Sequence, residues 1–528
     1  GTSGTSGTSG TSGTSGMSGS GGTGGAHGGT SGSGGSAGVS EGPFVLLKDM
    51  DADIFSSPRY FTRAGDEVFF AAKGDSGDSG LWATDGTAAG TRLVYGDVVP
   101  RRLRENESEN AEFVVLDDKI LFEGAGEPWI SDGTTAGTML LKDINPGSAY
   151  SNPFSAERFG NRVFFLADDG VSGIEPWVSD GTAAGTYRIA DTSPGPGHCE
   201  GDPRGIAWEG KFYFYCVGEN ENHAYHVSYW VTDGTVEGTT RLVGGTDPYG
   251  SVLLNFDRIG FQNRVFFTFY TAATGEEIWV TDGTAGGTTL LKDCAARAGS
   301  FPQDFTVFGD KLLFFAYDDS FEVVLWSSDG TPAGTTILAR AEHAPNEENM
   351  QLLGDKLVFN ARPSDASEPY TLWVTDGTAA STTSIADIMA FSDRHFARLG
   401  DELLFFGGPY ASTDIEPWVT DGTPGGTRLV KDIVAGDMGS VRGNSSNPSL
   451  MVSLAGKAYF PAKLSYSDVQ FFASDGTASG TELLTPEGAG DGPNPMGEPF
   501  AFDDMLLVTG TWNDSSIGLY RYRPDASR

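Results

Sequence analysis

The chain is poor in cysteine, in basic residues and in long apolar runs, and each shortage excludes a class of protein. Three cysteines in 528 residues are too few for a disulfide scaffold. No run of about 18 apolar residues occurs, so the sequence predicts no insertion into a membrane. Lys and Arg number 34 against 71 Asp and Glu, which gives a net charge of −37. Because so acidic a surface repels phosphate backbones, nucleic acid is not an expected partner, whereas divalent cations are favoured.

Recognisable catalytic motifs are also missing. No P-loop, HExxH zinc motif, GxSxG nucleophile elbow or strand-linked GxGxxG stands in a fitting context. The chain holds six histidines, and its 75 glycines make partial glycine motifs expected by chance. No cofactor is therefore expected from motifs, and an active site would have to be assembled from other residues.

Residues 1–43 contain little except Gly, Ser and Thr. These three types make up 35 of the first 40 residues, and the chain opens with GTS repeated five times. Such a segment buries no apolar area that could offset the entropy lost on ordering it. It predicts a flexible tether, reaching roughly 35 Å, that holds a domain of residues 44–528 off a surface. A tail without this role is the alternative.

A motif consisting of Trp, a small or apolar residue, Ser or Thr, and then DGTxxGT recurs nine times after the tether. Its aspartates lie 45 to 54 residues apart, at Asp85, Asp132, Asp180, Asp233, Asp282, Asp329, Asp376, Asp421 and Asp475. Its tryptophans are Trp82, Trp129, Trp177, Trp230, Trp279, Trp326, Trp373 and Trp418, with Phe472 in the ninth copy. The Gly before the last Thr is replaced once, by Ser381. A repeat of this length is typical of the blades of a β-propeller.

Each repeat contains short apolar runs bounded by Gly and polar turn residues, as in 65–72 (GDEVFFAA) and 160–167 (GNRVFFLA). Runs this short, rich in Val, Leu and Phe, predict strands rather than helices. Adjacent residues such as Phe164 and Phe165 point to opposite faces of a strand, so both faces of each sheet must be covered. A blade packed between two neighbouring blades meets this condition, and the predicted fold is therefore an all-β propeller.

The two ends of the repeat region complement each other. Residues 44–49 (FVLLKD) match the strand that follows a motif, although no motif precedes them. Residues 503–508 (DDMLLV) and 518–522 (GLYRY) match the strands that precede one, although no motif follows. Together they would complete a tenth blade and close one ring, which removes two sheet edges. Two five-bladed rings are the alternative.

The repeats resemble those of the bacterial ELWxxDGT repeat proteins. The resemblance extends over residues 44–523, with copies such as 275–293 (GEEIWVTDGTAGGTTLLKD) and 415–433 (IEPWVTDGTPGGTRLVKDI). It implies an exported, surface-associated, propeller-like protein, and it implies no catalytic residues. The sequence departs from the family pattern where proline replaces its Leu, at Pro128, Pro176 and Pro417.

The repeated residues are interpreted as structural. In a turn the motif Asp accepts backbone N–H groups, the Gly supplies a positive φ, and the Thr hydroxyls satisfy further backbone groups. A metal-binding or catalytic Asp is the alternative, but a reaction needs one or two placed carboxylates rather than nine. The tryptophans are expected to pack blade against blade, with a ring of sugar-binding platforms as the alternative.

Asp49, Asp51 and Asp53 form a DxDxD sequence like the opening of an EF-hand calcium loop. The pattern then fails, because Ile54 replaces the turn Gly and Tyr60 replaces the bidentate Glu. A solvated acidic loop is the favoured interpretation, and calcium is the alternative.

The fourth repeat is unusually rich in two metal-binding residue types. It holds Cys199, Cys216, His198, His223 and His226. In an exported protein the favoured interpretation is a disulfide between Cys199 and Cys216, which leaves Cys294 as a buried free thiol. Unpaired cysteines are one alternative. Zinc held by both cysteines and one or both of His223 and His226 is another, although the spacing is not that of a zinc finger.

These features predict a non-enzymatic binding or adhesion module. Variable loops such as 218–229 and 434–449 would be presented on a rigid frame, and such loops commonly carry recognition. The expected partner is a protein or a glycan, and the expected state is a monomer on its tether. The alternative is a hydrolase of the glycosidase or lyase type with a site in the central channel. It would need a carboxylate pair with a cationic or aromatic partner at non-repeated positions.

The expected location is outside the cytoplasm, either secreted or anchored to the cell surface through a lipid or the wall. This expectation rests on the tether and on the family resemblance. No secretory signal is visible and residue 1 is Gly rather than Met, which predicts a processed or truncated chain.

Overall fold

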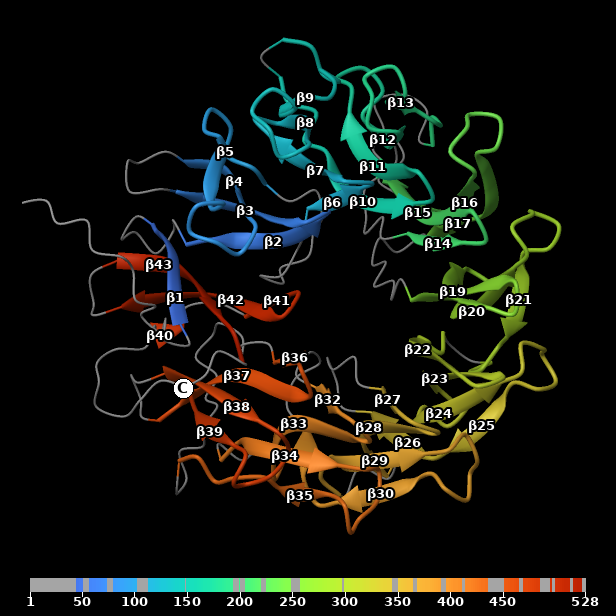
Figure 1. Ribbon diagram of the computed structural model, residues 1–528. Coiled ribbons are helices and arrows are strands. Elements are labelled where there is room, and N and C mark those ends of the chain that lie inside the picture. Colours follow the sequence, from blue (N-terminus) through green and yellow to red (C-terminus); the bar gives the residue numbers. More distant parts are fainter. Residues whose placement is uncertain are drawn as a thin grey trace, which may run out of the picture. The chain divides into compact units, whose positions relative to one another are not determined.

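The computed structural model divides the chain into two units, residues 1–41 and 42–528. It describes residues 44–524, all in the second unit, except for gaps at 51–56, 74–78, 102–112, 148, 193–198, 200–204, 220–224, 248–256, 297–298, 344–349, 364–367, 391–395, 411–413, 435–450, 465–468, 485–493, 496–498 and 513–515. The described residues form strands and no helix. The strands make ten antiparallel sheets arranged in a ring, which is a ten-bladed β-propeller (Figure 1).

The first five blades each contain four strands. Blade 1 comprises β2 (Arg59–Ala64), β3 (Glu67–Lys73), β4 (Ser79–Thr84) and β5 (Arg92–Tyr95); blade 2 comprises β6 (Val114–Leu116), β7 (Lys119–Gly124), β8 (Glu127–Ser131) and β9 (Met139–Leu140). Blade 3 comprises β10 (Phe154–Phe159), β11 (Arg162–Asp168), β12 (Ile174–Ser179) and β13 (Tyr187–Arg188); blade 4 comprises β14 (Ile206–Trp208), β15 (Lys211–Glu219), β16 (Tyr225–Thr232) and β17 (Thr240–Asp247). Blade 5 comprises β18 (Arg258–Phe261), β19 (Arg264–Thr271), β20 (Gly275–Thr281) and β21 (Thr289–Lys292).

The other blades have four or five strands. Blade 6 comprises β22 (Gln303–Phe308), β23 (Lys311–Tyr317), β24 (Val323–Ser328) and β25 (Thr336–Ala339); blade 7 comprises β26 (Ala341–His343), β27 (Gln351–Leu353), β28 (Lys356–Pro363), β29 (Thr371–Thr375) and β30 (Thr383–Ala386). Blade 8 comprises β31 (Met389–Ala390), β32 (Ala397–Leu399), β33 (Glu402–Gly408), β34 (Glu416–Thr420) and β35 (Arg428–Leu429); blade 9 comprises β36 (Val452–Leu454), β37 (Lys457–Lys463), β38 (Val469–Ser474) and β39 (Glu482–Leu483). Blade 10 comprises β40 (Asn494–Pro495), β41 (Phe500–Phe502), β42 (Met505–Trp512), β43 (Ser516–Tyr522) and β1 (Phe44–Asp49).

Each blade has two ends, and these define two faces of the ring. In blade 3, Ser179 pairs with Val163, so the DGT turn after β12 lies at the same end as the hairpin between β10 and β11. At the other end Asp168 pairs with Ile174, and the connection from the preceding blade enters at Phe154. We call the first end the DGT face and the second the connector face. The innermost strands, such as β2, β6 and β10, lie nearest the centre of the ring (Figure 1).

Ten apolar clusters fill the interfaces between consecutive blades. The motif tryptophans and Phe472 all lie at the interface with the preceding blade; for example, Trp177 packs with Leu121 and Ile130 of blade 2. Phe164 and Phe165 belong to different interfaces, as the alternation of side chains along a strand requires. The predicted blade-on-blade packing is therefore what the structure contains.

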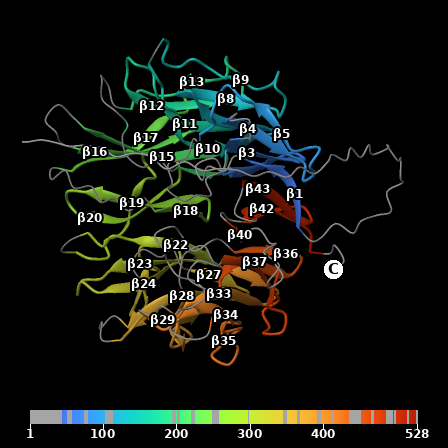
Figure 2. The ribbon, with the colours of Figure 1, turned by 90° about the vertical axis from the view of Figure 1, so that its left-hand side faces the viewer.

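The ends of the chain close the ring. Strand β1 pairs with β43, and β43 pairs with β42, so the first strand completes the last blade (Figure 1 and Figure 2). One apolar cluster joins blade 10 to blade 1 and another joins blade 9 to blade 10. The prediction of one ring is confirmed, and the alternative of two five-bladed rings is wrong.

Cations add a polar link between blades on the DGT face. Arg92 donates to the carbonyl oxygen of Gly133 at 3.0 Å, and Arg521 of blade 10 donates to that of Gly86 at 3.0 Å. The glycine after the motif Asp accepts the same kind of bond in four further turns, from Arg162, Lys311, Lys356 and Arg428. Such charge-assisted bonds are stronger than neutral ones, so they reinforce the apolar interfaces.

Within the described ranges, no helix is long and apolar enough to cross a membrane.

Candidate functional site

The motif aspartates have a structural role. All nine are exposed on the DGT face. In the first copy Asp85 Oδ1 accepts the backbone N–H of Thr87 at 2.8 Å and its hydroxyl at 2.7 Å. The Thr87 hydroxyl lowers the pKa of Asp85 below its ordinary value. The pKa is lowered in the same way at Asp132, Asp233, Asp282, Asp329, Asp421 and Asp475, and at Asp376 mainly by Ser381. The carboxylates are thus used within their own turns.

The predicted calcium site cannot be assembled from the described residues. Asp49 lies at the end of β1 and is exposed, whereas Asp51 and Asp53 lie outside the described residues. The solvated acidic loop therefore stays the prediction, with calcium as its alternative.

The two cysteines of the fourth repeat lie together. Their Cα atoms are 5.0 Å apart and their sulfur atoms are joined, which is the separation that a disulfide needs. His226 lies on β16, and burial lowers its pKa, whereas His223 lies outside the described residues. Cys294 is buried and free, and burial raises the pKa of its thiol. The disulfide between Cys199 and Cys216 stays a prediction, which non-reducing peptide mapping can test.

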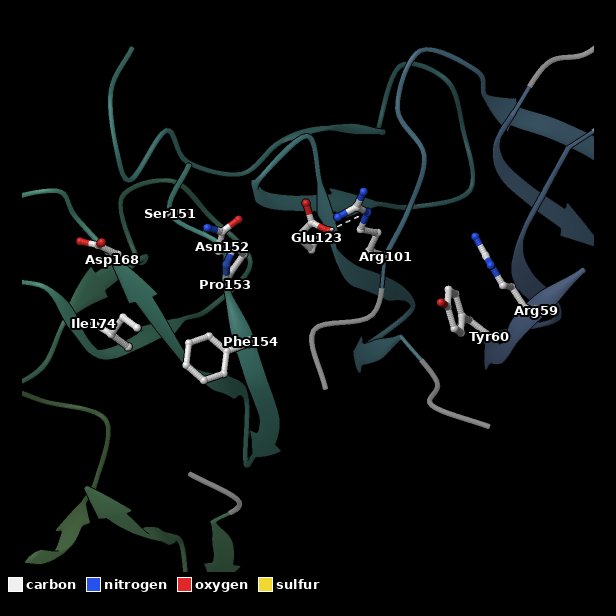
Figure 3. Close-up of a pocket in the computed structure, with 10 residues that line it drawn as sticks. All are labelled: Arg59, Tyr60, Arg101, Glu123, Ser151, Asn152, Pro153, Phe154, Asp168 and Ile174. Atoms are coloured by element: carbon white, nitrogen blue, oxygen red, sulfur yellow. Dashed lines mark ion pairs between the residues drawn. The ribbon is translucent and has the colours of Figure 1, made fainter. Parts of the chain in front are cut away.

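A different place on the ring holds a pocket, on the connector face over blades 1 to 3. It is a cavity of about 560 Å³, lined by Arg59, Tyr60, Arg101, Glu123, Ser151, Asn152, Pro153, Phe154, Asp168 and Ile174 (Figure 3). The start of β2 supplies Arg59 and Tyr60, the end of β7 supplies Glu123, and the end of β11 supplies Asp168. The pocket thus brings together two carboxylates, two guanidinium groups and two aromatic rings.

Glu123 is held firmly at the wall of this pocket. Its side chain is 11% exposed and forms an ion pair with Arg101 at 3.8 Å. Its Oε1 accepts the backbone N–H of Gly126 at 2.7 Å, and its own backbone forms two hydrogen bonds with that of Arg101. These contacts orient the carboxylate.

Asp168 lies on the other side of Asn152 and Pro153 (Figure 3). Its Oδ1 accepts the backbone N–H of Gly170 at 2.7 Å, and its backbone N–H donates to the carbonyl of Ser151 at 3.0 Å. Among the residues drawn in Figure 3, an ion pair joins only Arg101 to Glu123. The two carboxylates therefore have different partners, a guanidinium at Glu123 and a backbone N–H at Asp168.

Aromatic and cationic side chains complete the pocket. Arg59 lies over the ring of Tyr60, with its guanidinium carbon 5.2 Å from the ring centroid. Tyr60 has a φ of 63°, in the left-handed region that costs a bulky residue free energy. Asn152 also has a positive φ, of 41°. A positive φ recurs at Ser155 and Asp304, the second residues of β10 and β22, so at Tyr60 it is a feature of the repeat.

Sequence reasoning missed these residues, although the repeat contains a signal for Glu123. Glu123 directly follows the residue that pairs with the motif Trp. Among the nine copies of the repeat, it is the one charged residue at this position. The other copies carry Ala71, Leu166, Tyr215, Thr268, Phe315, Asn360, Phe406 and Pro461. Aligning the repeats by strand register would have identified it.

Buried glutamates were missed as well. In four blades a Glu lies two residues before the motif Trp, as Glu127, Glu175, Glu277 and Glu416, and each is buried. Glu277 accepts hydrogen bonds from the N–H of Cys294 at 2.9 Å, the N–H of Ser300 at 2.9 Å and the Ser300 hydroxyl. Burial raises the pKa of Glu277 to about 7. These glutamates hold the connectors between blades and do not face the pocket.

Comparison with known proteins found no matching family model and no matching curated protein. Among solved structures, a mutant puromycin hydrolase complexed with PGG is 13% identical, over 86% of this chain and 58% of that one, with a TM-score of 0.32. Oligopeptidase B from Leishmania major is 10% identical, over 90% of this chain and 54% of that one, with a TM-score of 0.33. The β-propeller domain of the Trilobed protease from Pyrococcus furiosus is 13% identical, over 61% of this chain and 96% of that one, with a TM-score of 0.27.

These findings correct the expected function. The solved structures that share the fold are those of hydrolytic enzymes rather than of a non-enzymatic binding or adhesion module, so the expected module is not proposed for this chain. The chain spans less than two thirds of the length of the puromycin hydrolase and of oligopeptidase B. At such low identity the likeness extends to the fold, and their activities and substrates are not carried over.

Proposed function

We propose that the chain is a hydrolase of glycosidic bonds and that the pocket over blades 1 to 3 is its active site. The observation that supports this most directly is the pairing of a held, ion-paired carboxylate, Glu123, with a second carboxylate, Asp168, in one cavity. A carboxylate pair beside cationic and aromatic side chains is the arrangement that glycoside hydrolysis uses.

The roles of the two carboxylates follow from their surroundings. The Arg101 guanidinium and the Gly126 N–H fix the Glu123 carboxylate at the wall of the pocket, so Glu123 suits the base that accepts a proton from the attacking water. Asp168 then acts as the acid and gives a proton to the leaving oxygen as the bond from that oxygen to the anomeric carbon breaks. The new bond joins the water oxygen to the same carbon, so one water is consumed for each bond cleaved.

The pocket contains little that would support the chemistry of a serine peptidase. Among the side chains that the structure describes, the one histidine is His226, in blade 4. Ser151 is in the pocket, but it is buried and its hydroxyl donates to Glu127 at 2.6 Å. That carboxylate also accepts the backbone N–H groups of Ile144 and Ser151, so the hydroxyl belongs to a structural network and its residue is buried.

The test is turnover of a panel of aryl glycosides and neutral polysaccharides by the protein and its Glu123→Gln variant. We expect kcat to fall by roughly 10²- to 10⁴-fold in Glu123→Gln, the usual contribution of a general base, with an unchanged melting temperature. Asp355→Asn, at an exposed turn carboxylate on the DGT face, is the matched control and should leave turnover unchanged. Absence of turnover on the whole panel, or full activity of Glu123→Gln, would contradict the proposal.

An extracytoplasmic location, expected from the tether and the family resemblance, agrees with a substrate of this kind, because polymeric glycans are abundant at cell surfaces. It stays part of the proposal.

A further inference from the structure

The exposed aromatic side chains of the ring lie on one face. Among the described residues, the large exposed aromatics are Tyr150, Phe301, Tyr317, Phe321 and Tyr410. Each lies at the connector face: in a connection between blades, at the end of a second strand, or in the turn that follows one. The pocket opens on this same face. Scattered exposed apolar residues are ordinary, but all five of these aromatic residues lie on the face that carries the pocket.

Three of these side chains belong to blade 6 and to the connector that leads into it, and we call them the aromatic platform. Phe301, Tyr317 and Phe321 are 43%, 36% and 58% exposed. The rings of Phe301 and Tyr317 are 6.2 Å apart and nearly perpendicular. Phe321 stands in the turn between β23 and β24, and Asp319 of this turn accepts a hydrogen bond from the connector at Ala296 N–H. Two segments that contact each other thus present three aromatic rings to solvent.

The backbone holds the platform rigidly and against its own preference. Phe301 and Phe321 have φ values of 49° and 60°, in the left-handed region that bulky residues avoid. Phe321 N–H donates to the carbonyl of Asp318 at 3.0 Å, and Phe301 N–H donates to that of Glu276 at 3.2 Å. Tyr317 N–H donates to the carbonyl of Ser300 at 2.8 Å. These hydrogen bonds fix the backbone that carries the three rings.

Polar groups around the platform identify its ligand class. Arg340 forms ion pairs with Asp318, at 3.0 Å, and with Glu322 of the same turn. Hydrogen-bonding groups beside exposed rings suit a ligand with both hydroxyl and C–H surfaces, and a pyranose ring has both. Its C–H groups meet the negative faces of the aromatic rings. The net charge of −37 opposes a polyanion.

We infer that the aromatic platform is a distal binding site for a neutral polysaccharide, which is cleaved in the pocket on the same face. This inference rests on the proposed glycosidase function and adds its substrate class: a polymer, rather than a short oligosaccharide. Binding at a second site raises the effective concentration of the polymer at the pocket, whereas a short substrate gains nothing from it.

Binding is tested on a protein that does not hydrolyse the probe. Affinity electrophoresis in native gels containing xylan, mixed-linkage β-glucan or starch compares Glu123→Gln with Glu123→Gln/Phe301→Ala/Phe321→Ala. We expect at least one polysaccharide to retard the first protein and the two added substitutions to weaken binding about ten-fold. Leu352→Ala, at an exposed strand residue near the DGT face, is the control and should leave retardation unchanged.

The outcomes separate the platform from the active site. Retardation that the Phe301→Ala/Phe321→Ala pair abolishes supports the platform, even if the unmodified protein hydrolyses nothing and the proposed function fails. Absence of retardation on all three polysaccharides overturns the platform, and so does retardation that the pair leaves intact. In the active protein the pair should raise KM for the polymer and leave aryl glycoside turnover unchanged, and an equal loss on both substrates would also overturn it.

Discussion

At the scale of single residues, Glu277 shows how a repeat motif can place a carboxylate in the core of a blade interface. The side chain is fully buried and accepts hydrogen bonds from two backbone N–H groups and one hydroxyl in the connector to blade 6. Burial disfavours the ionised form of the Glu277 carboxyl, whereas the hydrogen-bond donors favour it. Burial is the larger effect and raises the pKa of Glu277 to about 7.

Glu277→Gln is expected to lower the free energy of unfolding by about 1–3 kcal/mol, because either orientation of the amide turns its nitrogen toward a backbone N–H. Chemical denaturation measures this, with exposed Asp355→Asn as a control that should change stability by less than about 0.5 kcal/mol.

The contribution of Glu277 to stability also depends on pH, and the direction of this dependence follows from its pKa. The folded pKa of about 7 lies above the ordinary value of 4.5, so the contribution of Glu277 is fully present below pH 4.5 and is lost as pH rises through 7. The stability of the parent relative to Glu277→Gln should therefore fall over this interval, by up to about 3 kcal/mol. A relative stability that rises with pH would contradict the assignment.

At the scale of the element, the DGT turn explains why its closing residue is almost always Gly. A Cβ built on Gly287 would meet the carboxylate of Asp282, and the closing glycine of seven other copies stands in the same relation to its own Asp. In the seventh blade Ser381 takes this place, and its hydroxyl donates to Asp376 instead. The replacement of Gly by Ser381 therefore keeps the motif Asp within a hydrogen-bonded turn.

Gly287→Ala is expected to destabilise the protein by about 1–3 kcal/mol, because the new methyl group crowds the Asp282 carboxylate and, unlike Ser381, brings no hydroxyl that could bond to it. The neighbouring Gly286 is the matched control, since a Cβ there meets no atom within 4 Å. Gly286→Ala should change the melting temperature little. Equal losses in the two variants would show that the carboxylate contact does not set the glycine requirement.

The strands and their order were predictable because local signals repeat. Nine copies of one motif report the same turn, and the alternation of apolar residues reports the same strand in each blade. The pocket was not predictable in this way, because Glu123 departs from the apolar or neutral residues at its repeat position, and Glu123, Ser151 and Asp168 meet only when blades 2 and 3 are assembled. The cations that reach glycine carbonyls were missed for a similar reason, since Arg92 and Gly133 are neighbours only across a blade interface.

At the scale of the whole domain, closure of the ring depends on one strand from the other end of the chain. Strand β1 supplies the last strand of blade 10, and Met50 N–H donates to the carbonyl of Ile517 at 2.8 Å. Leu47 and Met50 enter the cluster that joins blade 10 to blade 1, at 4% and 0% exposure. Without β1 the edge of β43 would be unpaired, and a free edge invites association with other chains.

The closure is tested by two neighbouring leucines of β1 that differ in burial. Leu47→Ala removes a side chain from the interface between blades 10 and 1, and should lower the free energy of unfolding by about 2–5 kcal/mol. Leu46, one residue earlier, is 45% exposed, so Leu46→Ala should lower the free energy of unfolding clearly less, although it removes the same chemical group from the same strand.

Deleting residues 44–50 removes both the strand pairing and the cluster contacts, and should lower the melting temperature sharply and produce oligomers in size-exclusion chromatography. If the deletion variant were as stable as the parent, or if the two leucines were equivalent, β1 would not be what holds the ring closed.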